Sequence, residues 1–117
     1  TRRAQASEVV LAASSARTCV SERNQSSTAD TINYSTCTPD DGGATQFVTA
    51  VTVSNVGIIR AEAADTLEGL NVYLQPIVRD GFITGWNCIG VVTGDTAKST
   101  WLPSSCEAGT APTAVAE

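Results

Sequence analysis

Residues 1–22 contain neither proline nor glycine, and their apolar side chains recur at the three- and four-residue spacing of a helix face. The members of this stripe are Ala6, Val9, Val10, Ala13, Ala16 and Val20. Leu11 is expected to widen it. A helix with one apolar face needs a second layer to cover that face. The sequence therefore predicts a long N-terminal helix packed on another element.

The first turn of this helix lacks the usual start signals. Arg2 and Arg3 lie where cations oppose the helix macrodipole. Thr1 can serve as a cap, but no acidic residue follows three positions later. We interpret residues 1–22 as a helix that is cut part-way along and truly begins upstream. A native start with a poor cap is the alternative.

A polar stretch over residues 23–45 separates the helix from a region of predicted antiparallel strands. It is rich in Ser, Thr, Asn and Asp, and it ends in the turn cluster of residues 39–43. Strands are predicted over residues 46–54, 58–64, 70–78 and 82–89. A sheet of four strands with one apolar face needs a cover, and the amphipathic helix supplies it.

Alternation in two of these strands indicates which side chains face inward. Ile59, Ala61 and Ala63 share one face, with Arg60 and Glu62 on the other. In the third strand the inward set is Leu70, Val72 and Leu74, and the outward set is Asn71, Tyr73 and Gln75. Residues 79–81 (Arg-Asp-Gly) are typical of a hairpin turn. After the last strand, we expect Trp101, Leu102 and Pro103 to anchor a loop over residues 90–106 on the sheet, and residues 107–117 to form a loose tail.

The chain has four cysteines and no Cys-x-x-Cys pair, which argues against zinc-knuckle and thioredoxin sites. Four cysteines allow three disulfide connectivities. Sequential pairing would close two loops of equal span, each stabilising by about 3 kcal/mol in the loop-entropy model. The alternative to disulfide pairing is that all four cysteines are free, buried thiols. Disulfides indicate the periplasm, the cell surface or the exterior.

Composition excludes several classes of function. With 12 acidic and 7 basic residues, the net charge of −5 excludes a strongly basic nucleic-acid footprint. The absence of histidine removes the usual catalytic triad and the commonest zinc ligand. Asp40 and Asp41 fit solvated turn formers better than a calcium site, because they lack the alternating ligand pattern. The sequence predicts neither a catalytic site nor a cofactor. The triplet Asn24-Gln25-Ser26 matches an N-glycosylation signal, a pattern that is frequent by chance.

Three segments together resemble a bacterial type IVa pilin. Residues 1–8 (TRRAQASE) are similar to the middle of the pilin helix, just after its membrane-spanning half. Residues 69–76 (GLNVYLQP) and 81–88 (GFITGWNC) resemble the last two strands of the pilin sheet. Residues 101–106 (WLPSSC) resemble the closing turn, in which an aromatic residue precedes Leu-Pro.

The resemblance implies an α+β fold, in which a long N-terminal α-helix packs on a four-stranded antiparallel meander that is followed by a C-terminal disulfide-bounded loop. We expect one pilin domain over residues 1–117. Its expected parts are the helix (1–22), the αβ-loop (23–45), the sheet (46–89), the disulfide-bounded loop (88–106) and the tail (107–117).

Two sets of contacts follow from this layout. Cys88 lies in the last strand and Cys106 ends the loop after it, so these two cysteines are expected to pair. Cys19 and Cys37 would then tie the helix to the αβ-loop. The helix is expected to pack on the sheet through Val9, Val10, Ala13 and Val20 against Leu70, Val72 and Leu74.

The resemblance also implies a function. The expected role is that of a structural subunit of a type IV pilus, which supports adhesion, twitching motility or DNA uptake. The alternatives are a minor pilin acting as a DNA receptor and a type II secretion pseudopilin. Expected partners are other pilin subunits and the assembly machinery of the inner membrane, with no strong nucleic-acid binding. Contact with the membrane is expected only through an apolar helix removed upstream. The subunit would lie in the inner membrane or periplasm before it joins a surface pilus.

Overall fold

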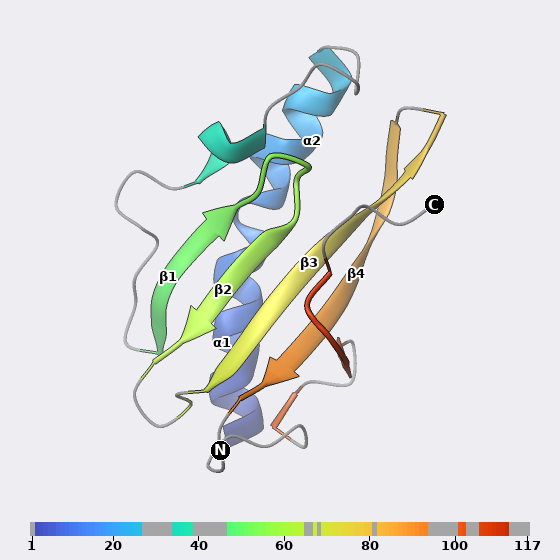
Figure 1. Cartoon of the computed structure of the whole chain (residues 1–117). Coiled ribbons are helices and arrows are strands. Elements are labelled where there is room, and N and C mark those ends of the chain that lie inside the picture. Colours follow the sequence, from blue (N-terminus) through green and yellow to red (C-terminus); the bar gives the residue numbers. More distant parts are fainter. Residues whose placement is uncertain are drawn as a thin grey trace.

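The computed structural model describes residues 2–26, 34–38, 47–64, 67, 69–80, 82–93, 101–102 and 106–112. The helical elements are α1 (Arg2–Ser14), α2 (Arg17–Ser26) and the 3-10 turn η2 (Tyr34–Cys37). The strands are β1 (Val48–Val53), β2 (Ile59–Ala63), β3 (Leu70–Arg79), β4 (Phe82–Val92) and β5 (Cys106–Ala108). Figure 1 shows α1 lying behind a single twisted sheet.

The N-terminal helix is interrupted, which differs from the predicted continuous helix over residues 1–22. α1 ends at Ser14, Ser15 and Ala16 form a turn, and α2 continues to Ser26. Ser15 Oγ donates to the Ala12 carbonyl oxygen at 2.7 Å, and the Ala16 amide donates to the Ala13 carbonyl oxygen at 3.2 Å. Such three-residue contacts tighten the backbone locally and interrupt the four-residue ladder of an α-helix.

The helix buries a narrower face than the apolar pattern predicted. Val9, Ala13 and Val20 are fully enclosed, and α1 packs against β1, β2 and β3. Val10 is only partly buried at the edge of this interface. Leu11 is 71% exposed, so the prediction that it widens the stripe is wrong. The helix therefore contacts the sheet through a narrow stripe, which is less than half of the helix circumference.

The sheet has five strands in the order β1-β2-β3-β4-β5. The first four pair antiparallel, as the predicted meander requires, and β5 pairs with β4 in parallel. The alternation predicted for the second strand is confirmed, because Ile59, Ala61 and Ala63 are buried while Arg60 and Glu62 are exposed. In β3 the inward residues Leu70, Val72 and Leu74 are buried against the helix side. The core therefore lies between α1 and the first three strands.

The β3–β4 hairpin extends past the end of β2, as Figure 1 shows. Pro76 is buried in β3 and has no backbone N–H to donate to a neighbouring strand. β2 pairs with β3 only as far as Leu74, so the proline leaves no β2 carbonyl oxygen without its donor. Asp80 turns the hairpin with a φ of 54°, in the left-handed region that Asp and Asn tolerate better than most residues. α2 packs against β4 in this projecting part.

Part of the expected loose tail over residues 107–117 belongs to the sheet. β4 continues to Val92 instead of ending at Ile89, and Glu107 and Ala108 belong to β5. The Gly109 amide then donates to the Gly90 carbonyl oxygen at 3.0 Å, which fixes the chain as it leaves the strand. The turn cluster at 39–43 and residues 113–117 lie outside the described residues.

Candidate functional site

A disulfide and a buried asparagine tie the αβ-loop to the helix and the sheet. Cys19 of α2 and Cys37 of η2 are bonded, with their Cα atoms 5.7 Å apart. Asn24 is 2% exposed; its Nδ2 donates to the Tyr34 hydroxyl at 3.2 Å, and its Oδ1 accepts from the Ile83 amide at 3.0 Å. One side chain thus joins α2, η2 and β4. The glycosylation triplet at Asn24 is inaccessible in the folded chain, because the amide is enclosed and hydrogen-bonded.

The second disulfide joins the last two strands. Cys88 and Cys106 are bonded, their Cα atoms are 4.6 Å apart, and they are direct partners in the parallel β4–β5 register. Between them the chain returns through Leu102, which is buried, and Trp101, which is partly buried against the core. These positions agree with the anchoring role that the sequence predicts for these two side chains, while Pro103 lies outside the described residues.

Leu102 rests on a glycine, and this close approach leads to a testable prediction. A Cβ atom at Gly90 would meet both methyl groups of Leu102 and come within 2.9 Å of its Cγ. Gly90→Ala is therefore expected to destabilise the chain by about 1–3 kcal/mol through overpacking. Gly85→Ala is the matched control in the same strand, because its Cβ would lie 3.5 Å from Ile77.

Thermal unfolding monitored by circular dichroism measures both changes. In a Leu102→Ala background the cost of Gly90→Ala should shrink, since the colliding atoms are gone. An equal cost in the two backgrounds would contradict the contact.

The outer face of the sheet, opposite α1, carries a row of side chains from all five strands. The strand registers place Thr52 beside Arg60, Arg60 beside Tyr73, Tyr73 beside Ile89 and Ile89 beside Glu107. The Arg60 guanidinium donates from Nη2 to Asn71 Oδ1 at 3.2 Å, and Asn71 is itself buried. This hydrogen bond restrains the cation of Arg60 on the surface of the sheet.

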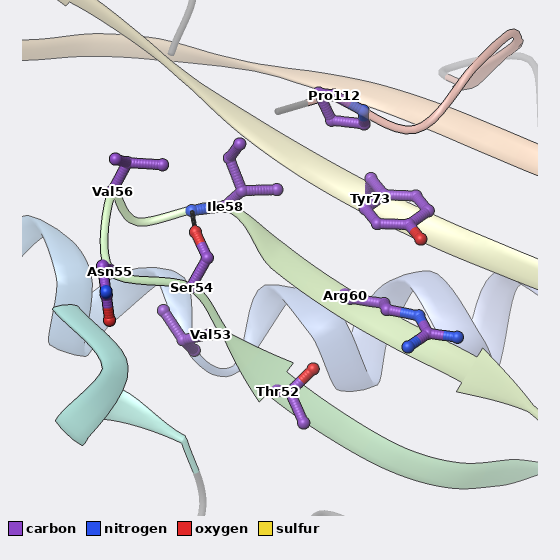
Figure 2. Close-up of a pocket in the computed structure, with 9 residues that line it drawn as sticks. All are labelled: Thr52, Val53, Ser54, Asn55, Val56, Ile58, Arg60, Tyr73 and Pro112. Atoms are coloured by element: carbon purple, nitrogen blue, oxygen red, sulfur yellow. Dashed lines mark hydrogen bonds between the residues drawn. The ribbon is translucent and has the colours of Figure 1, made fainter. Parts of the chain in front are cut away.

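A hollow of about 480 Å³ opens over the first three strands at one end of this row. We call it the β1–β3 hollow; its residues include Thr52, Val56, Ile58, Arg60, Tyr73 and Pro112. Figure 2 shows Pro112 on the far side of Tyr73 from β2, so the C-terminal segment forms one wall. Ser54 Oγ accepts from the Ile58 amide at 3.1 Å, which closes the β1–β2 turn at the rim.

Sequence reasoning placed Arg60 and Tyr73 on the outward face but did not bring them together in a site. Alternation along one strand gives the face, whereas the neighbour across the sheet depends on the register between strands. No sequence pattern indicated a role for Pro112, because it lies in the segment that was expected to be loose.

Among the residues that the structure describes, metal-binding groups and membrane-spanning helices are both absent. In this part of the chain no group of three or more His, Cys, Asp or Glu residues is arranged to hold a metal ion. Among the same residues, no helix combines the length and the apolar character needed to cross a bilayer.

Comparison with known protein families matches residues 2–107 to Pilin, a bacterial filament family. A search of curated proteins finds no match. A helix packed on a mostly antiparallel sheet that is closed by a disulfide defines an α+β protein, and the match covers the helices, β1 to β4 and both cysteines of that disulfide. The chain belongs to the pilin family. Pilins are structural proteins rather than catalysts. Membership implies assembly with other pilins in a filament and a place in a pilus at the cell surface.

Proposed function

We propose that the chain, as one domain of residues 1–117, is a structural subunit of a type IV pilus. The observation that carries this proposal is the family match over residues 2–107, which spans the helix, the sheet and the closing disulfide. Assembly is the mechanism: identical copies stack into a fimbria that serves adhesion, twitching motility or DNA uptake. The expected packing of Val9, Val10, Ala13 and Val20 on Leu70, Val72 and Leu74 would hold the domain together for this task. All of these side chains except Val10 belong to one buried core cluster, and Val10 packs against it.

The acidic balance of the chain favours the filament role over that of a DNA receptor. The net charge is −5, and DNA binding needs several cations that neutralise phosphates. Among the basic side chains that the structure describes, Arg17, Arg23, Arg60 and Arg79 are exposed, and they lie on α2, β2 and the end of β3. Such scattered cations do not form a stripe along which a nucleic-acid backbone could lie.

Deletion of the gene tests the filament role. We expect the deletion strain to lose surface filaments or to carry far fewer, and a plasmid copy to restore them. Immunogold electron microscopy with an antibody against the chain should label filaments along their length. Gel analysis of sheared pili then gives the abundance of the subunit, which distinguishes a major from a minor pilin. Unchanged filament number, motility and transformation in the deletion strain, with no gold label on the filaments, would refute the proposal.

A further inference from the structure

We propose that the β1–β3 hollow binds an acidic saccharide, that is, a sugar ring that carries a carboxylate. The hollow combines one restrained cation, one aromatic ring and several hydroxyl and amide groups within a volume of about 480 Å³. Ligand sites commonly measure roughly 300–1,000 Å³ and pair apolar walls with a few polar groups that fix orientation.

The charge of the hollow selects an anion. Arg60 is the one charged side chain among the residues that line it, in a chain whose net charge is −5. Its guanidinium has five N–H donors in a planar fork that matches a carboxylate. Asn71 Oδ1 accepts one of these donors at 3.2 Å, which restrains the fork without neutralising it, because an amide oxygen carries no net charge. Arg60 is exposed, so a solute can reach the guanidinium.

The remaining side chains suit a sugar ring. Tyr73 is half-buried and is the direct cross-strand neighbour of Arg60, so a ring that lies on its face can place a carboxylate at the guanidinium. A pyranose presents an apolar C–H face, which packs on aromatic and aliphatic surfaces such as Tyr73, Val56 and Pro112. The Thr52 hydroxyl and the Asn55 amide, both on exposed residues, supply donors and acceptors for sugar hydroxyls.

The wall at Pro112 is held by the end of the fold. The Cys88–Cys106 disulfide and the parallel β4–β5 pairing position residue 108, and the bond from the Gly109 amide to the Gly90 carbonyl oxygen fixes the next residue. Gly109 is therefore restrained, and Pro112 follows it by only three residues. Its place in the hollow depends on the second disulfide.

Titration of the 117-residue chain with tri-galacturonate tests the proposal, with the methyl ester of the same trisaccharide as the neutral control. We expect saturable binding of the acid, measured by calorimetry and by amide chemical shifts, and binding of the ester weaker by about tenfold or more. Arg60→Gln should weaken binding of the acid to the level of the ester. Tyr73→Leu should weaken binding of both forms. Arg79→Gln is the matched control, because Arg79 is an exposed arginine outside the hollow.

The parent chain alone also decides the question if a variant fails to fold. The amide shifts that respond to the acid should belong to Thr52, Arg60 and Tyr73 and not to the β3–β4 turn. Absence of saturable binding, equal affinity for acid and ester, or shifts elsewhere would overturn the proposal. So would tighter binding of a single-stranded oligonucleotide with a steep loss of affinity in salt, which would assign the cation to phosphate contacts instead.

Discussion

Replacement of both Cys88 and Cys106 by alanine is expected to lower the melting temperature by about 10 °C or more and to leave few filaments on the cell surface. The bond closes a loop between residues 18 apart, and its loss returns about 3 kcal/mol of conformational freedom to the unfolded chain. The folded state also suffers, because β5 has only three residues and pairs with β4 from the disulfide onward. A subunit that unfolds before assembly is exposed to proteolysis, so fewer copies reach the filament.

The Cys19→Ala/Cys37→Ala double variant is a matched control, since its cysteines have the same sequence separation of 18. The loop-entropy term is therefore equal in the two variants. η2 and the residue after it keep other ties to the sheet. The Val53 amide donates to Thr38 Oγ1 at 2.9 Å, and the Tyr34 amide donates to the Asn55 carbonyl oxygen at 3.2 Å. We expect the loss at Cys88 and Cys106 to be the larger one. If both variants have the same melting temperature, β5 does not depend on its disulfide.

Periodicity predicted the layers of this fold because it reports burial directly. The strand alternation at Ile59, Ala61 and Ala63 gave the inward face of β2, and that face is buried. The same reasoning located the helix, but it overestimated the width of the helix face that packs on the sheet. Each residue turns a helix by about 100°, so Leu11 lies about 200° from Val9 and points away from the sheet. Counting apolar residues along the sequence did not take account of this rotation.

The features that sequence reasoning missed depend on contacts between distant segments. β5 has three residues, too few for a period, and its parallel pairing is set where Cys106 meets Cys88. The helix break depends on a hydrogen bond from the Ser15 side chain, which competes with the regular ladder. The β1–β3 hollow needs the registers of three strands and the path of the chain after β5. None of these is encoded in a local pattern.

Three consecutive residues of α1 allow the helix–sheet interface to be tested by position alone. Val9 is fully enclosed, Val10 is partly buried and Leu11 is 71% exposed, although all three are aliphatic and lie in the same helix. An aspartate at Val9 would place an unpaired charge between α1 and the sheet, at an expected cost of about 3–5 kcal/mol. The same change at Leu11 leaves the charge in water and loses only helix propensity, at most about 1 kcal/mol.

Urea unfolding of the three variants, Val9→Asp, Val10→Asp and Leu11→Asp, should therefore rank them in that order, with Val9→Asp the least stable. The position in the helix is nearly constant across the series and the losses of helix propensity differ by less than about 1 kcal/mol, so large differences in midpoint report the burial of each site. Val9→Asp is expected to lose a large share of the roughly 5–15 kcal/mol that stabilises a small domain, so its urea midpoint should fall far below that of the parent chain. Leu11→Asp should retain the near-ultraviolet circular dichroism of the parent chain. Equal midpoints for Val9→Asp and Leu11→Asp would mean that α1 is rotated relative to the sheet, and a Leu11→Asp variant less stable than Val9→Asp would place the opposite face of the helix in the core.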